Sequence, residues 1–331
     1  MKVSLLCFST MGEKTKDSIQ KALPFEFSVY ERDMVDAKDF VKTAFFESDA
    51  LVFVGAVGIA VRLCAGHIRS KDTDPAVVVV DEQAQYVIPM LSGHLGGANA
   101  LARRLASALD AKAVITTSTD TNGVFAVDDW CRENNCVIAD TAMIKQVSSA
   151  LLRNETVGLQ SDFPIDGELP TGLVQGTQSR IGVCVSLDAA KKPFDKTLNV
   201  IPKIVTVGAG CRKGTDSADF DSMVRAVFAK QDISVKAIKT LASIEQKAGE
   251  RCMVEFAEKN RIPFMVYSAA ELGALTGEYG SSPFVEREMG VGNVCERSAM
   301  AAANDGELIL KKKAMDGMTI AAAAQNWRCV F

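Results

Sequence analysis

Short apolar runs that end in glycine turns constrain this fold more than any other feature. The segment "ALVFVGAVGIAVR", residues 50–62, joins five apolar residues to a glycine and then to a second apolar segment. A run without alternating polar residues is typical of a strand covered on both faces, as in a parallel sheet flanked by helices. The same order recurs in "IPMLSGHLGGANALARR" and "VTVGAGCRKGTD". We therefore predict an α/β fold with layered, mostly parallel sheets.

The 331 residues suit two or three domains of ~100–200 residues each. Alternating strand and helix patterns fill 1–130, and they return over 204–331. Between them, 131–203 has short apolar runs interrupted by prolines and glycines, which indicates a less regular connecting domain. We predict an N-terminal α/β domain, this middle segment and a C-terminal α/β domain with those bounds. The main predicted strands are 3–8, 77–80, 86–91, 112–117 and 203–210, and the main predicted helices are 13–23, 97–109, 218–230, 245–259 and 294–303.

Composition excludes several classes of protein. No run reaches the ~18 apolar residues of a membrane span, and the opening segment lacks a signal-peptide cleavage pattern, so we expect neither membrane insertion nor secretion. Nine scattered cysteines form no disulfide framework or zinc spacing, which favours a reducing cytoplasm and predicts no protein metal site. A net charge of −4 argues against nucleic-acid binding. Any anionic ligand must therefore be bound by local groups.

The three glycine turns are candidates for such binding. Bare backbone at the start of a helix directs N–H groups outward, where the helix dipole favours a carboxylate or phosphate. Acids are absent between Asp49 and Asp72 and between Glu82 and Asp110. Simple strand-to-helix geometry is the alternative for any single turn, and the missing dinucleotide and phosphate-loop signatures disfavour a nucleotide. The candidate binding residues in these turns are Gly55, Gly58, Arg62, Ser92, Gly93, Gly96, Gly97, Asn99, Gly208, Gly210, Cys211 and Arg212.

Few side chains offer acid–base chemistry. His94, one of only two histidines, lies in the second turn and can exchange a proton near neutral pH, unless it merely caps the turn. Thr116, Thr117 and Asp120 follow a predicted strand, where open α/β sheets bind ligands, although a polar capping loop would also explain them. Lys247 and Glu250 are spaced either for a surface ion pair or for a site.

These motifs resemble a known family. "GAVGIAVR", "PMLSGHLGGANALARRLA", "VITTSTDTNGVFAVDDW", "VGAGCRKGT" and "GVGNVCERSAMAAA" are similar to segments of the cobalt-precorrin-5A hydrolases (CbiG) of anaerobic cobalamin synthesis. The resemblance is specific in the first α/β domain, good in the last, and mainly positional in the middle. It implies an N-terminal domain, a variable middle, and a C-terminal domain that occurs alone in a small relative from the aerobic pathway.

The resemblance also implies a function. Members open a δ-lactone on a ring-contracted cobalt corrinoid and release acetaldehyde. Cobalt would arrive within this substrate, so no cofactor is expected, and other enzymes of the pathway are possible partners. We expect His94 to act as base or acid, N–H groups near Gly96 and Gly97 to bind an oxyanion or carboxylate, and Asp120 or Glu250 to orient water. Thr116, Thr117 and Lys247 would contact substrate. The alternative is a tetrapyrrole carrier without catalytic activity.

Overall fold

The computed structural model describes residues 1–70 and 73–331. Lys71 and Asp72, which end the first acid-free stretch, lie outside the described residues. The chain divides into two compact units, one made of 1–132 with 148–155 and the other of 133–147 with 156–331. The mixed α/β architecture with mostly parallel strands confirms the predicted fold class. The predicted domain bounds at 130 and 203 stay a prediction.

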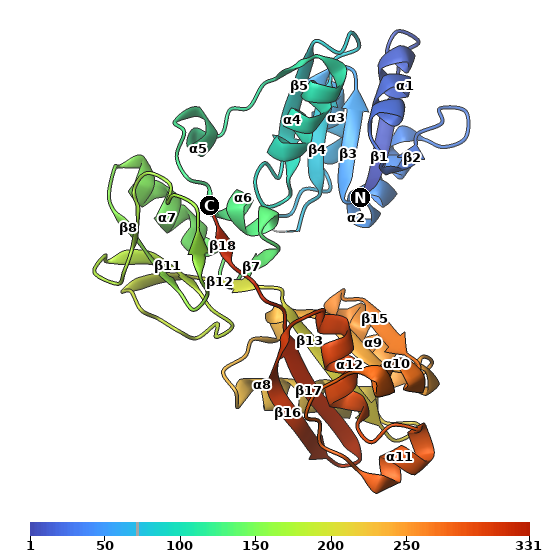
Figure 1. Ribbon diagram of the computed structural model, residues 1–331. Coiled ribbons are helices and arrows are strands. Elements are labelled where there is room, and N and C mark those ends of the chain that lie inside the picture. Colours follow the sequence, from blue (N-terminus) through green and yellow to red (C-terminus); the bar gives the residue numbers. More distant parts are fainter. Residues whose placement is uncertain (71–72) are drawn as a thin grey trace. The chain divides into compact units, whose positions relative to one another are not determined.

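The first unit contains one six-stranded sheet in the order β2-β1-β3-β4-β5-β6 (Figure 1). Neighbouring strands are parallel except for β4 and β5, which pair antiparallel, as expected for the two apolar runs on either side of "DEQAQ". The strands are β1 (Lys2–Cys7), β2 (Glu26–Val29), β3 (Ala50–Val54), β4 (Ala76–Val80), β5 (Tyr86–Leu91) and β6 (Lys112–Ala113).

Helices cover both faces of this sheet, because the central strands are apolar on both sides. Val52 and Val54 pack under α1 and α4, whereas Leu51 and Phe53 pack under α2 and α3. All four of these β3 side chains are at most 1% exposed, which fits the reading of this run as a fully buried strand. The helices are α1 (Glu13–Ala22), α2 (Ala37–Glu47), α3 (Val57–Cys64), α4 (Ala98–Leu109), α5 (Ser118–Thr121) and α6 (Val127–Glu133).

The antiparallel β5 determines where the glycine turns lie. Its last residue, Leu91, pairs with Val77 near the amino end of β4. The turn at 92–97 therefore lies at the edge where β1, β3 and β4 begin, whereas Gly55 follows the carboxyl end of β3. Strands of five residues separate these edges by roughly 16 Å. The first two predicted glycine turns consequently cannot form one site around the sheet edge.

The second unit contains two larger sheets. The first, in the order β10-β8-β11-β12-β7, is built from 133–202 and is more regular than the sequence predicted. Proline and glycine confine its strands to short runs, and this hid the sheet from a reading of the sequence. Its elements are β7 (Cys136–Ile138), β8 (Val157–Ser161), β10 (Leu173–Gln175), β11 (Ile181–Val185) and β12 (Lys196–Pro202), and α7 (Ala142–Leu152) runs through the boundary between the units.

The other sheet has the order β15-β14-β13-β17-β16, with β13, β14 and β15 parallel, β17 antiparallel to β13, and β16 antiparallel to β17. Its strands are β13 (Val205–Cys211), β14 (Ile238–Ile244), β15 (Phe264–Tyr267), β16 (Glu307–Met315) and β17 (Met318–Ala324). Its helices are α8 (Ser217–Ala229), α9 (Arg251–Asn260), α10 (Ala269–Ala274), α11 (Pro283–Met289) and α12 (Val294–Ala303), with single 3-10 turns η1 (Val235–Ala237) and η2 (Glu245–Lys247).

Alternate residues of β13 serve the two faces of this sheet. Val207 and Ala209 pack with Phe220 of α8 and Phe256 of α9 in the main core. On the opposite face α12 lies directly on the backbone, since a Cβ at Gly208 would stand 1.8 Å from the Cys295 carbonyl oxygen. A short parallel pair, β9 (Ile165–Asp166) with β18 (Cys329–Val330), ties the C-terminal segment to the 133–202 region.

Some elements differ from the predictions. The strand predicted at 112–117 contains only Lys112–Ala113, and the helix predicted at 245–259 breaks at 248–250 between η2 and α9. Within the part of the chain that the structure describes, no helix combines the length and apolar character needed to cross a bilayer.

Candidate active site and ligand cavity

In the turn that carries His94, close packing leaves no room for side chains at some of the glycine positions. Ser92 adopts a left-handed φ of 56°, and a Cβ on Gly96 would lie 2.3 Å from the Ser92 Cβ. Gly93 is similarly restricted, since a Cβ there would lie 3.0 Å from Asn99 Oδ1. Gly97 caps α4 with a φ of 82°, which a residue with a side chain rarely adopts. These glycines are thus explained by backbone geometry before any ligand is considered.

His94 is held by polar partners on several sides. Its Nε2 lies 3.0 Å from Asp120 Oδ2 and 3.0 Å from Thr119 Oγ1. Its Nδ1 lies 3.6 Å from Asp128 Oδ2, beyond a direct hydrogen bond. The side chain remains 19% exposed. If Nε2–H donates to Asp120, Nδ1 is the nitrogen that can exchange a proton with a bound molecule.

Asp120 is the centre of this network. Its Oδ2 accepts from Thr117 Oγ1 and from Asn99 Nδ2 at 3.1 Å, and its Oδ1 accepts from Arg103. Burial acts to raise the pKa of Asp120, but the hydrogen bonds from Thr117, Arg103 and His94 outweigh it and hold the pKa below its usual value. A carboxylate with so many donors is poorly placed to activate water. Its geometry suits orienting the imidazole.

No acidic residue lies near this turn in the sequence, but in the folded structure acidic side chains surround it. Three carboxylates converge on His94: Asp120, Asp128, and Asp129, whose Oδ2 lies 3.8 Å from Nε2. Burial raises the pKa of Asp129, with a further upward contribution from Asp128, while His94 opposes this. The sequence analysis gave "VDDWCRENN" no part in the site and so missed Asp128 and Asp129. The adjacent acids at the start of that helix were the available signal.

The backbone N–H groups of the turn are largely engaged by the turn itself. The Gly97 N–H donates to the His94 carbonyl at 2.8 Å, and the N–H groups of Ala98 and Asn99 donate to the Ser92 and Gly93 carbonyls. The sequence predicts that the Gly97 N–H binds an oxyanion, but in the structure this N–H already donates to the His94 carbonyl oxygen. Because closing the turn uses these donors, the His94 ring and its carboxylates become the main polar groups there.

The polar groups of the first glycine turn, at 55–62, already form hydrogen bonds within the protein. Arg62 Nη1 donates to the carbonyl of Gly58 at 3.1 Å, so its guanidinium folds back on its own helix. The Gly55 N–H donates to Val80, and a Cβ at Gly55 would meet nothing within 4 Å. Thr116, by contrast, follows β6 at the same edge as His94, next to Thr117.

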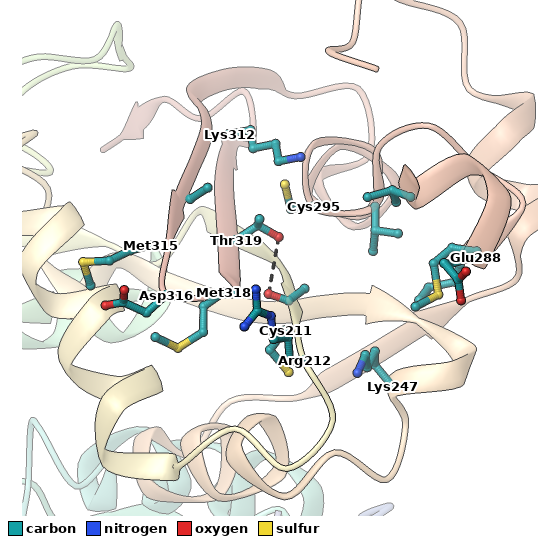
Figure 2. Close-up of a pocket in the computed structure, with 17 residues that line it drawn as sticks. Cys211, Arg212, Lys247, Glu288, Cys295, Lys312, Met315, Asp316, Met318 and Thr319 are labelled. Carbon is teal, nitrogen blue, oxygen red and sulfur yellow. Dashed lines mark hydrogen bonds between the residues drawn. The ribbon is translucent and has the colours of Figure 1, made fainter. Parts of the chain in front are cut away.

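The second unit holds a cavity of about 440 Å³ at the carboxyl ends of β13 and β14 (Figure 2). The β16–β17 hairpin, α11 and the start of α12 complete its walls. Predicted residues Gly210, Cys211, Arg212 and Lys247 line it, but Gly208 does not, because α12 packs over that position. The apolar part of the lining comprises Ile244, Val285, Met289, Val294, Ala314, Met315 and Met318.

Two cationic side chains line this largely apolar cavity. Figure 2 shows Arg212, in the turn after β13, and Lys312, on β16, among the lining side chains. Over residues 1–70 and 73–331, neither cation lies within 4.0 Å of a carboxylate oxygen in an ion pair, although Glu288 and Asp316 line the same cavity. The sequence reading missed Lys312, which lies in the ordinary-looking strand "GELILKK". Unpaired cations beside apolar walls suit an amphipathic anion.

Lys247 and Glu250 pair with each other instead. Lys247 Nζ lies 3.1 Å from Glu250 Oε2, and Glu250 Oε1 accepts the Gly214 N–H at 2.8 Å. Burial acts to raise the pKa of Glu250, but the bonds from Gly214 and Lys247 outweigh it and lower the pKa. Glu250 belongs to the second unit, where its contacts stabilise the turn after β13, and its role in orienting water stays a prediction.

Two groups of side chains in the described ranges have donor atoms close enough for one metal ion, within 4.8 Å of one another. They are His94 with Asp120 and Asp129, and Cys211 with Glu250 and Cys252. In the first group, Asp120 already accepts hydrogen bonds on both oxygens.

Family models for the three regions of cobalamin synthesis protein G match this chain: the N-terminal region at 39–120, the central region at 125–202 and the C-terminal region at 205–323. A cobalt-precorrin-5A hydrolase from Salmonella typhimurium is 34% identical over 84% of this chain and 83% of its own. The chain belongs to the cobalt-precorrin-5A hydrolase (CbiG) family. This confirms the resemblance, the hydrolase class and the link to cobalamin synthesis.

Two further proteins are similar to this chain. A cobalt-precorrin-5A hydrolase from Priestia megaterium is 30% identical over 84% of this chain and 79% of its own. A crystal structure of a cobalamin biosynthesis protein G homologue from Sulfolobus solfataricus is 23% identical, with a TM-score of 0.44, over 98% of this chain and 97% of that one.

Proposed function

We propose that this CbiG family member hydrolyses the δ-lactone of a ring-contracted cobalt corrinoid, cobalt-precorrin-5A, and releases the extruded carbons as acetaldehyde. The observation that carries the proposal is the His94 ring, oriented by Asp120 at 3.0 Å and still reachable from solvent. The names of its relatives support the substrate. Cobalt enters as part of that substrate, and we place the reaction in the cytoplasm with other enzymes of the pathway.

Lactone opening needs a water molecule and a base. In the proposed step, His94 Nδ1 takes a proton from water while the water oxygen forms a bond to the lactone carbonyl carbon. The ring C–O bond of the ester then breaks, and the leaving alkoxide receives a proton from the imidazolium. Asp120, bonded to Nε2, stabilises the charged ring throughout and is a positioning residue.

Release of acetaldehyde then breaks a carbon–carbon bond. The freed hydroxyl loses its proton, its oxygen forms the aldehyde carbonyl, and the electron pair of the broken bond passes to the conjugated macrocycle, which takes up a proton. The macrocycle supplies the electron sink, so the protein needs to provide only proton transfer and geometry. Asp129, whose carboxylate lies 3.8 Å from His94 Nε2 and whose pKa is raised by burial, is the candidate for a second proton carrier.

We infer that the cavity of the second unit binds an edge of the macrocycle. A corrinoid combines an apolar ring with acetate and propionate side chains, and the cavity combines apolar walls with Arg212 and Lys312, while the carboxylates of Glu288 and Asp316 also line it. We assign corrinoid carboxylates to these cations. Gly210 and Cys211 form the adjoining wall, which a flat ligand can approach closely.

Anaerobic incubation with the lactone-bearing cobalt intermediate, followed by chemical trapping of aldehyde, tests the function. The proposed hydrolase yields one acetaldehyde for each lactone opened, and the corrinoid gains a free carboxylate. A carrier without catalytic activity would shift the corrinoid spectrum and yield no aldehyde, and that result would overturn the proposal.

A further inference from the structure

Two cysteines far apart in sequence meet at the carboxyl end of β13. Cys211 ends this strand and lines the cavity, whereas Cys252 lies in the first turn of α9 and is fully buried. Their sulfur atoms are 3.7 Å apart, although 41 positions separate them along the chain. No spacing motif could have revealed the pair.

The distance between the two sulfur atoms fits two thiolates on one metal ion better than it fits a disulfide bond. A disulfide requires an S–S distance of ~2.05 Å, so the sulfurs would have to approach by about 1.7 Å. Two thiolates on one tetrahedral metal, with bonds of ~2.3 Å, stand about 3.8 Å apart. The third donor, a Glu250 carboxylate oxygen, lies within 4.8 Å of both sulfurs.

From this geometry we propose that Cys211, Cys252 and Glu250 bind a thiophilic divalent metal ion such as Zn²⁺ or Co²⁺. Two sulfur donors and one carboxylate favour these ions over Mg²⁺ or Ca²⁺, which prefer oxygen ligands. Because Cys211 lines the cavity, solvent or a small solute can supply the fourth ligand. The site shares no residue with the His94 network and does not depend on the proposed hydrolysis.

Charge balance makes the site compatible with burial. Glu250 and Lys247 already form an ion pair at 3.1 Å. Binding M²⁺ releases two protons to the buffer and forms two metal–thiolate bonds, so two positive charges leave as two enter. The net charge is unchanged, and the burial penalty for an added ion is reduced.

The neighbouring contacts also permit ligation. One Glu250 oxygen can keep the Gly214 N–H bond while the other turns from Lys247 to the metal. The metal would then join the end of β13 to the start of α9, directly beside the turn that carries Arg212. We therefore expect metal binding to stabilise this edge of the cavity.

Cobalt(II) added to reduced, chelator-treated full-length protein tests the site. An equimolar ion should produce a thiolate-to-cobalt charge-transfer band together with the visible bands of tetrahedral cobalt. Cys211→Ser and Cys252→Ser should weaken binding by more than the ~10- to 100-fold typical of losing an outer-shell partner. Cys295→Ser is the matched control, a buried thiol at the same cavity but outside the cluster, and should keep the band.

Absence of the band in the parent protein, its persistence in Cys252→Ser, or its equal loss in Cys295→Ser would each overturn the proposal. If the serine variants do not fold, the parent protein still decides the question. Zn²⁺ should then protect Cys211 and Cys252, but not Cys295, from iodoacetamide in mild denaturant. Equal labelling of all three thiols with and without Zn²⁺ would contradict the site.

Discussion

At the scale of single residues, Asp120 shows how a sequence-distant carboxylate defines the His94 site. It receives hydrogen bonds from Asn99, Arg103 and Thr117 in addition to its contact with the imidazole. The polar loop "TTSTD" was predicted to be either a site or a cap, and the sequence could not decide between them. Convergence of Asp120 with His94 depends on β5 and β6 being parallel neighbours.

The network predicts a pH-dependent stability. Because the folded pKa of Asp120 is lowered, its ionised form stabilises the native state above the ordinary carboxyl pKa of 3.8, and this contribution is lost as pH falls through the lowered value. Asp120→Asn should therefore cost ~1–3 kcal/mol near neutral pH, and the gap to the parent should close below pH 3.8. Urea unfolding across this range measures the gap, and a constant gap would contradict the network.

At the scale of elements, sequence patterns were most informative where burial is complete. β1, β3, α4, α8 and α12 closely match their predicted spans, because apolar periodicity and glycine punctuation coincide there. β2, α2 and α7 were not predicted: β2 is a half-exposed edge strand, and no glycine turn precedes either helix. The site was only partly predictable, since Asp128, Asp129 and Lys312 lie in segments that look like ordinary helix and strand.

Glycines that looked alike in sequence have different roles in the elements. Gly208 allows α12 to contact β13, so Gly208→Ala should destabilise the second unit by ~1–3 kcal/mol through overpacking. Gly249→Ala is the matched control, because its Cβ would meet nothing within 4 Å, and it should change stability by less than ~0.5 kcal/mol. Denaturant midpoints compare the two variants. Equal midpoints would show that α12 does not restrict position 208.

At the scale of the whole molecule, an acidic chain must bind a polyanion through local cations. The net charge of −4 opposes non-specific attraction, and Arg212 and Lys312 offer unpaired charge beside apolar walls. Arg62, equivalent to Arg212 in the sequence reading, is turned back onto Gly58 and is a weaker candidate. Folding thus distinguishes two cations that the sequence pattern could not.

This distribution predicts which arginine matters for binding. Arg212→Ala should weaken binding of a corrinoid with free carboxylates, such as cobyrinic acid, by ~1.5–3 kcal/mol, or about 10- to 150-fold, and should reduce its salt dependence. Arg153→Ala is the control, because Arg153 pairs with Glu155 on the exposed surface. Titration at two salt concentrations provides the comparison, and equal affinities for both variants would remove Arg212 from the binding site.

The central claim is that His94 transfers a proton in lactone opening. The most direct measurement is a single turnover of the His94→Gln variant, with bound corrinoid and released aldehyde determined in the same sample and native folding checked by circular dichroism. We predict binding within about 3-fold of the parent and aldehyde release slower by ~10²–10⁴, as expected for a lost general acid or base. Aldehyde release at the parent rate from folded, substrate-bound His94→Gln would contradict the claim.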